Sequence, residues 1–138
     1  MKKFFLSALI CGCLFACKKD ESQNEIPYVP VDIVISLAQY TTLNSVTGWA
    51  YIPGGSKGIA VYRYSQDEFY AMDRHCPYQP ANGNQLSVDS TNIFLADGAC
   101  GSKFNMVYGG TVSNGPATRP LKRYNISYDG ITTLHIYN

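Results

Sequence analysis

The chain of 138 residues has few charged side chains and only two histidines, which excludes several classes of function. Charged residues make up 15% and the formal net charge is +1, so there is no basic surface to attract nucleic acid. The sequence has no Ser/His/Asp arrangement, phosphate-binding glycine loop, internal repeat or coiled coil. Its apolar run, residues 4–16, is shorter than the about 20 residues that a membrane-spanning helix needs. We therefore expect neither an enzyme, nor a nucleic-acid-binding protein, nor a membrane-spanning chain.

The N-terminus has the pattern of an export signal. Lys2 and Lys3 precede the apolar run, which ends in Leu-Phe-Ala-Cys at Cys17 and is followed by the polar residues 18–21. This ending resembles the lipobox of bacterial lipoproteins, in which the cysteine becomes the lipid-bearing first residue of the mature chain. The resemblance implies a signal peptide over residues 1–16 and a lipid anchor on Cys17. An ordinary secretory signal with a chance cysteine is the alternative.

The rest of the chain divides into a tether and one domain. Residues 17–30 are polar and then punctuated by prolines, which indicates a lipidated cysteine and a tether, and residues 31–138 form the domain. We expect the protein in the cell envelope, attached to a membrane through Cys17. With the signal removed and Cys17 acylated, Cys76 and Cys100 are the remaining thiols, and an even number in an oxidising compartment hints at a disulfide.

The domain shows short strand patterns and no long helical period. The chain has 11 tyrosines, 12 glycines and 7 prolines, a composition that favours many short strands separated by turns. Residues 38–46 are ambiguous and compatible with a short helical turn, and residues 76–91 and 111–120 are irregular. Turn signals lie at residues 53–55, 109–110 and 129–130. The predicted strands are residues 31–37, 48–52, 58–64, 68–74, 92–96, 104–108, 121–128 and 131–137. This pattern predicts an all-β fold, a small barrel or sandwich.

Two loops and a later segment carry the most specific pattern. Residues 69–78 read FYAMDRHCPY, residues 101–105 read GSKFN, and residues 115–121 read GPATRPL before Tyr124. These segments resemble the two cluster loops and the later Gly-Pro-Ala to Pro-Leu run of Rieske iron–sulfur domains. The resemblance covers about residues 60–128, and it implies a Rieske-like β-fold in which the two loops meet at one tip.

The resemblance also assigns the four positions that hold the metal in that family. Cys76 matches the first cysteine, and Tyr78 stands where the first histidine belongs. In the alignment that we prefer, Asp97 occupies the second cysteine position and Cys100 the second histidine position. In the other alignment Cys100 is the second cysteine and Lys103 replaces the histidine.

Both alignments lack the two imidazoles that a Rieske cluster requires beside its two thiolates. His75 stands directly before Cys76, rather than two residues after it, and His135 lies in the last predicted strand. A tyrosine phenol and a lysine amine are protonated at neutral pH, so Tyr78 and Lys103 are poor substitutes. We therefore expect no standard 2Fe–2S cluster and no other cofactor or metal.

The resemblance brings Cys76 and Cys100 close together, and we predict that they form a disulfide in place of the cluster. Closing a loop of this size contributes on the order of 3 kcal/mol. The alternatives are two separate buried thiols, a zinc site formed by His75, Cys76, Asp97 and Cys100, or an altered 2Fe–2S cluster that keeps the two cysteines as ligands.

The function expected from these features is binding or structural, with an unknown envelope protein or ligand as partner. The main rival is a Rieske-type electron-transfer protein of the envelope with altered ligands, and a weaker one is a docking subunit of a larger envelope oxidoreductase. Trp49 is expected in the core or on a sheet face. The basic residues Arg119, Lys122 and Arg123 are expected on a solvated strand face. The carboxylates Asp67, Glu68 and Asp73 lack a partner base or nucleophile.

Overall fold

The structure is a computed structural model, and it describes residues 25–138. The predicted signal peptide, the lipidated Cys17 and the first part of the tether lie outside the described residues. The described part consists of two antiparallel sheets and two 3-10 helices, η2 (Thr41–Asn44) and η3 (Pro80–Asn82). The prediction of an all-β fold is confirmed. Neither of these short helices could cross a membrane.

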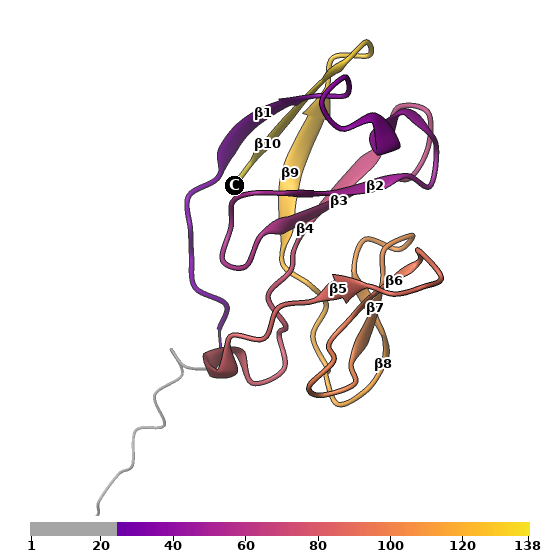
Figure 1. Cartoon of the computed structure of the whole chain (residues 1–138). Coiled ribbons are helices and arrows are strands. Elements are labelled where there is room, and N and C mark those ends of the chain that lie inside the picture. Colours follow the sequence, from indigo (N-terminus) through magenta and orange to yellow (C-terminus); the bar gives the residue numbers. More distant parts are fainter. Residues whose placement is uncertain (1–24) are drawn as a thin grey trace, which may run out of the picture.

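The larger sheet has six strands and forms the upper part of the molecule in Figure 1. Its strand order is β1-β10-β9-β4-β3-β2, and every neighbouring pair is antiparallel. Three hairpins along the chain therefore account for most of the order: β2 with β3, β3 with β4, and β9 with β10. The strands are β1 (Asp32–Ser36), β2 (Trp49–Ile52), β3 (Ile59–Arg63), β4 (Phe69–Asp73), β9 (Arg123–Tyr128) and β10 (Thr133–Tyr137).

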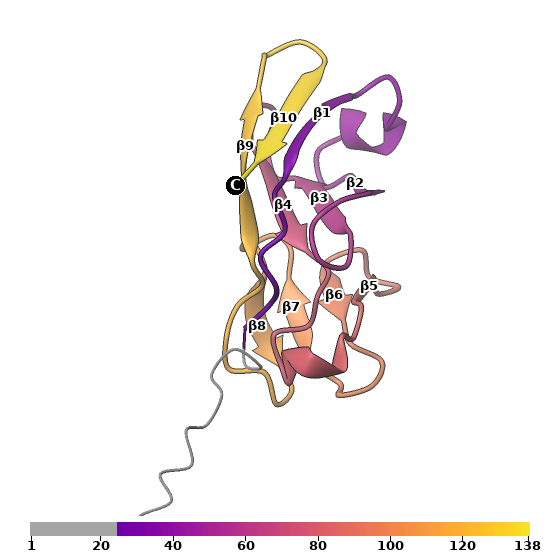
Figure 2. The same ribbon diagram turned by 90° about the vertical axis from the view of Figure 1, so that its left-hand side faces the viewer.

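The smaller sheet is an insertion between β4 and β9, and it lies below the larger sheet in Figures 1 and 2. Its order is β5-β6-β7-β8, so it is a simple antiparallel meander. The strands are β5 (Ser87–Val88), β6 (Phe94–Ala96), β7 (Lys103–Asn105) and β8 (Thr111–Asn114). The long loops before β5, between β6 and β7, and after β8 belong to this part of the molecule.

The strand β3 is buried on both faces because it lies between two hydrophobic cores. Ile59 and Val61 belong to the core under the larger sheet, together with Leu43 of η2 and Leu134 of β10. Ala60 and Tyr62 point to the opposite side, into a second core that contains Leu95 and Phe104 of the smaller sheet. The near-continuous apolar sequence of β3, IAVYR, follows from this double burial.

The one charged residue of β3, Arg63, is buried and acts as a cap for the turn around η2. Its guanidinium donates hydrogen bonds to the carbonyl oxygens of Leu43 (2.9 Å), Asn44 (3.1 Å) and Ser65 (3.1 Å), and also to that of Gln66. These carbonyls have no partner in a regular sheet, so the fork of Arg63 satisfies them and joins two loops.

The observed strands lie within the predicted ones except at β7, and two strands are additional. β5 and β8 fall in the segments expected to be irregular, and β7 begins at Lys103 and ends at Asn105, where Met106–Gly109 turns back. The 3-10 helix η2 lies within the ambiguous segment 38–46. The turn between β9 and β10 is longer than the two residues expected, since Tyr128 pairs with Leu134. It closes on the Asp129 carboxylate, which accepts three backbone N–H bonds.

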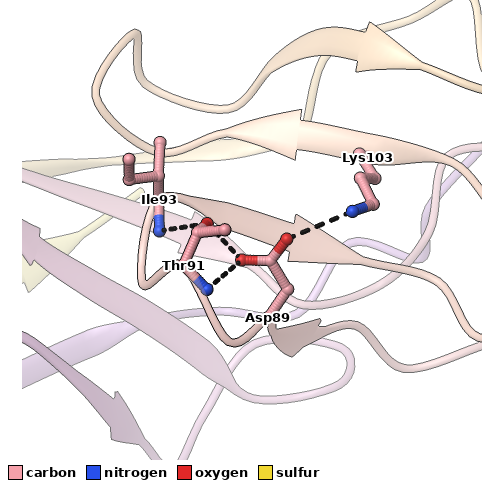
Figure 3. Close-up of polar contacts among 4 residues, drawn as sticks. All are labelled: Asp89, Thr91, Ile93 and Lys103. Carbon is pink, nitrogen blue, oxygen red and sulfur yellow. Dashed lines mark hydrogen bonds and ion pairs between the residues drawn. The ribbon is translucent and has the colours of Figure 1, made fainter.

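The turn between β5 and β6 is held by one carboxylate, shown in Figure 3. Asp89 accepts hydrogen bonds from the backbone N–H (3.0 Å) and the hydroxyl of Thr91, and the same hydroxyl is 3.3 Å from the N–H of Ile93. The other oxygen of Asp89 pairs with Lys103 Nζ on β7 at 3.2 Å. The contacts of Asp89 thus connect the β5–β6 turn to β7.

The described end of the predicted tether lies against the domain. Asn138 accepts a hydrogen bond from the Val31 N–H (3.1 Å) and donates one to the Val29 carbonyl (2.8 Å). Lys122 Nζ lies 5.2 Å from the ring centroid of Tyr28. Glu25 lines a shallow groove together with Pro77 and other residues of the lower loops. The chain therefore reaches the domain beside the smaller sheet and η3, as Figure 1 shows.

Candidate functional site

The first loop of the site follows β4 and folds back on itself. Leu86 N–H donates to the Arg74 carbonyl (2.7 Å), and Cys76 N–H donates to the Asn84 carbonyl (3.0 Å). His75 and Gln85 form a β-bridge between these two bonds. This irregular hairpin buries the Cys76 side chain completely, in the core between the two sheets.

The second loop joins β6 to β7, and Asp97 organises it. The Asp97 N–H donates to the Ser102 carbonyl, and the Gly101 N–H donates to the Asp97 carbonyl, both at 2.9 Å. The Asp97 carboxylate accepts from the backbone N–H groups of Ala99 (2.7 Å) and Cys100 (3.3 Å). This turn, in which an aspartate side chain bonds its own loop, directs the half-buried Cys100 back toward Asp97.

The segment 115–117 supports the second loop from behind. Gly115 has φ +95°, and a Cβ at this position would lie 2.4 Å from Ser102 Cα, so no other residue fits. The Ala117 N–H donates to Ser102 Oγ at 3.1 Å, and Ser102 Oγ lies 3.1 Å from Cys100 Sγ. The requirement for glycine at position 115 therefore has a local structural reason.

The two loops meet at Cys76, Asp97 and Cys100. The sulfurs of Cys76 and Cys100 are 3.9 Å apart, and both residues are free thiols in this structure. Among the described residues, these three side chains form the one group of at least three Cys, His, Asp or Glu whose ligand atoms lie within 4.8 Å of one another. Asn84 Nδ2 donates to Asp97 Oδ2 at 3.1 Å and so links the first loop to the second.

The Asp97 carboxylate is charged and sits at the centre of this group. Its burial alone would raise its pKa, but hydrogen bonds from Cys76, the Ala99 N–H, Cys100 and Asn84 outweigh burial and lower the pKa to about 2. The pKa of the Cys76 thiol is raised strongly, first by burial and then by its hydrogen bond to Asp97. In the reduced protein Cys76 is therefore a neutral thiol that donates to a carboxylate.

The two histidines of the chain lie outside this group. His75 Nε2 donates to the Pro80 carbonyl (2.8 Å), so in the neutral ring Nδ1 accepts from Ser56 Oγ (2.8 Å). His135 lies on β10, where Nε2 is 2.6 Å from Asp32. The zinc alternative that included His75 is therefore wrong in that ligand. The sequence had offered no sign of the Ser56–His75 contact, because the two residues come from different loops.

The structure also shows where the remaining predicted ligand positions lie relative to Cys76. Lys103, the histidine substitute in the second alignment, pairs with Asp89 and not with a cysteine. The hydroxyl of the half-buried Tyr78 lies 3.5 Å from Gln79 Nε2. The positions Asp97 and Cys100 of the preferred alignment are those that lie beside Cys76. The structure thus brings together three of the four positions by their side-chain ligand atoms.

These residues do not fit a Rieske cluster. Such a cluster takes two thiolates on one iron and two imidazoles on the other. Here two thiols and one carboxylate converge, and both imidazoles are hydrogen-bonded elsewhere. The donor set is one ligand short and lacks the nitrogen donors.

Asp73, another carboxylate considered in the sequence, is buried and accepts several hydrogen bonds. It is fully buried behind the site and accepts hydrogen bonds from Tyr124 Oη (2.6 Å) and from the backbone N–H groups of Ser56, Lys57 and His75. Burial, and then the hydrogen bond to the charged Asp73, raise the pKa of Tyr124. Asp73 therefore positions the start of the first loop rather than facing a ligand.

The aromatic and basic candidates lie on separate surfaces. Trp49 is half-buried and donates to Asn92 Oδ1 at 3.1 Å. Arg119 Nη2 lies 3.4 Å from the Pro77 carbonyl, whereas Lys122 and Arg123 stack near the rings of Tyr124 and Tyr70, respectively. Asp67 and Glu68 are exposed in the turn before β4.

Comparisons with known proteins give no relative: no model of a known protein family matches the chain, and no curated protein matches it.

Proposed function

We propose that this chain is an envelope lipoprotein, held at a membrane by lipid on Cys17, whose Rieske-like β-domain has a Cys76–Cys100 disulfide in place of an iron–sulfur cluster. Its role is binding or structural, with an envelope protein or ligand as partner, and not catalytic. The domain then serves as a scaffold that has the loop architecture without the iron–sulfur cluster.

The observation that carries the proposal is the approach of two sulfurs from separate loops to 3.9 Å, with no imidazole beside them. A disulfide bond is about 2.05 Å long, so the sulfurs would have to approach by about 1.9 Å more. The buried Cys76 and the half-buried Cys100 lie in a compartment that oxidises such pairs if the chain is exported. A bond there would tie the first loop to the second and contribute on the order of 3 kcal/mol.

The experiment is a thiol count on the full-length chain, purified in air in detergent. In a background with Cys11, Cys13 and Cys17 replaced by serine, Cys76 and Cys100 are the two cysteines left of five. We expect no thiol to react with maleimide under denaturing conditions before reduction and two to react after it. Intact mass is expected to rise by the mass of two hydrogen atoms on reduction.

Iron and visible absorbance are measured on the same sample. We expect a colourless protein without iron. We also expect the oxidised form to unfold at a higher urea concentration than the reduced form, with a free energy of unfolding that is larger by on the order of 3 kcal/mol. Two reactive thiols in the aerobic protein would contradict the disulfide. A red-brown protein with two irons per chain would instead support the altered-cluster alternative.

A further inference from the structure

We propose that, when both thiols are reduced, Cys76, Asp97 and Cys100 bind one thiophilic divalent cation of the Zn²⁺ type. The site is mononuclear and uses two sulfurs and one carboxylate oxygen, with water in the fourth position. The inference rests on the proposed function, because it concerns the same cysteine pair, and it adds what the reduced pair holds.

The separation of the sulfurs carries the inference. Zinc–sulfur bonds of about 2.3 Å in tetrahedral geometry set the two sulfurs about 3.8 Å apart. The observed distance between Cys76 Sγ and Cys100 Sγ is 3.9 Å. The third ligand atom, a carboxylate oxygen of Asp97, lies within 4.8 Å of both sulfurs. Binding therefore needs little movement of the sulfurs, whereas the disulfide needs a larger one.

Neighbouring groups hold the three ligands in place. Asn84 Nδ2 donates to Asp97 Oδ2, and the backbone N–H groups of Ala99 and Cys100 donate to Oδ1, so the carboxylate cannot swing away from the sulfurs. Ser102 Oγ and the Ser102 N–H lie 3.1 and 3.5 Å from Cys100 Sγ. Polar support of this kind around the ligands is a common property of protein metal sites.

The exchange of protons for the cation is balanced. In the metal-free state Cys76 and Cys100 are free thiols, and each carries one proton on its sulfur. A cation among the three ligands takes the place of these two protons, which leave to the solvent. Oxidation of the pair by a disulfide reagent gives the Cys76–Cys100 bond and two reagent thiols, and removes both sulfur ligands. The reduced form therefore binds the cation and the oxidised form does not.

The test uses Co²⁺ and Zn²⁺ salts on the full-length chain with Cys11, Cys13 and Cys17 replaced by serine, in detergent and without oxygen. After reduction and removal of the reductant, we expect one Co²⁺ per chain, with thiolate charge-transfer bands and the intense d–d bands of tetrahedral cobalt. Zn²⁺ is expected to displace it one for one. A sample oxidised with a disulfide reagent is expected to bind none.

Three variants separate the site from general surface binding. Asp97→Asn changes a direct ligand and is expected to weaken binding by at least the about 10- to 100-fold that loss of an outer-shell partner costs. Cys100→Ser is expected to halve the charge-transfer intensity. The matched control is Asp89→Asn, which changes the carboxylate of the neighbouring turn and should leave affinity unchanged (Figure 3). Circular dichroism melts show whether each variant is folded. If Cys100→Ser does not fold, Cys100→Ala gives a second test.

The outcomes distinguish the two proposals. A folded, reduced protein that binds no Co²⁺, or one whose affinity Asp97→Asn and Asp89→Asn reduce equally, overturns the cation site and leaves the disulfide intact. An aerobic protein that keeps two thiols yet binds one Co²⁺ overturns the disulfide and supports the cation site.

Discussion

At the scale of the residue, two buried charged side chains form hydrogen bonds with loop backbone groups that have no partner within the sheet. Arg63 at the end of β3 donates to loop carbonyls, and Asp73 at the end of β4 accepts from loop N–H groups. The two strands are neighbours in the larger sheet, but the charges serve opposite ends of the β3–β4 hairpin. Each charge is stable in the interior because several hydrogen bonds replace its hydration.

Asp73→Asn is expected to destabilise the fold by about 3 kcal/mol. The side chain would keep its shape, but one carboxylate oxygen would become an N–H₂ group that faces donors instead of accepting from them. Urea unfolding measures the loss. Tyr124→Phe removes one of these donors and should cost about 1 kcal/mol. Asp67→Asn, in the exposed turn before β4, should stay within about 0.5 kcal/mol of the parent. Equal effects of Asp73→Asn and Asp67→Asn would refute the role of Asp73.

Asp129 provides a pH-dependent contribution at the β9–β10 turn. Hydrogen bonds from the N–H groups of Thr133, Ile131 and Thr132 lower its pKa to about 2, from the 3.8 of an ordinary aspartate. Because the folded pKa is the lower one, the stabilisation is fully present above pH 3.8 and is lost as pH falls through about 2. We expect the Asp129 carboxyl carbon to titrate near pH 2 in the folded chain by NMR and near its ordinary pKa in urea. The same pKa in both states would contradict the capping role.

At the scale of the element, strands with apolar alternation could be predicted and the short strands of the insertion could not. β5 has two residues and β8 reads TVSN, with one half-buried position, so neither carries a pattern of its own. They exist because β6 and β7, with buried Leu95 and Phe104, offer edges to pair with. Tertiary context decides such strands. The long turn after β9 was missed because Asp129-Gly130 suggests a tight hairpin, whereas the aspartate instead caps three amides.

Three glycines from different loops should lose stability to different extents when replaced by alanine: Gly98 between β6 and β7, Gly130 between β9 and β10, and Gly115 after β8. Gly98→Ala should be neutral within about 0.5 kcal/mol, because nothing lies within 4 Å of the new Cβ and φ is not positive. Gly130→Ala adds only backbone strain at φ +80°, about 1 kcal/mol. Gly115→Ala adds strain and a Cβ 2.4 Å from Ser102 Cα, and should cost about 3–5 kcal/mol.

Thermal and urea unfolding of the three variants measure this order. Gly115→Ala should also move the NMR signals of Ser102 and Cys100, since its Cβ presses on the second loop. An order in which Gly130→Ala costs as much as Gly115→Ala would show that the close approach at Ser102 is not what requires glycine.

At the scale of the whole molecule, the sequence predicted the all-β class and the residues of the site more fully than it predicted their chemistry. The strand patterns lie in β3, β4, β9 and β10, which form the central framework. Cys76, Asp97 and Cys100 were found by their place in a family-like pattern, and the structure brings them together. The hydrogen bonds between Asn84 and Asp97 and between Ser56 and His75 join residues 13 and 19 positions apart, so they leave no local trace in the sequence.

The position of Glu25 predicts how the domain stands on a membrane if Cys17 carries lipid. Glu25 lies beside Pro77 and Arg119, and also beside Pro80 of η3, at the end of the molecule opposite the β9–β10 turn (Figure 1). The chain from Cys17 to Glu25 spans at most about 29 Å when fully extended. The end that holds the cysteine loops should therefore face the lipid.

Fluorescent maleimide on Ala81→Cys in η3, or on Ile131→Cys in the exposed far turn, tests this orientation in the acylated protein on vesicles. The Cys76–Cys100 pair is kept oxidised so that the probe reacts at the introduced thiol. Lipid-borne quenchers should reduce the emission of the Ala81→Cys probe several-fold more than that of the Ile131→Cys probe, because quenching falls steeply with distance from the bilayer. Protein released by proteolysis between Cys17 and Glu25 should show no such difference. Equal quenching at both positions on intact vesicles would mean that the domain has no fixed orientation, and stronger quenching at Ile131→Cys would mean that it stands the other way up.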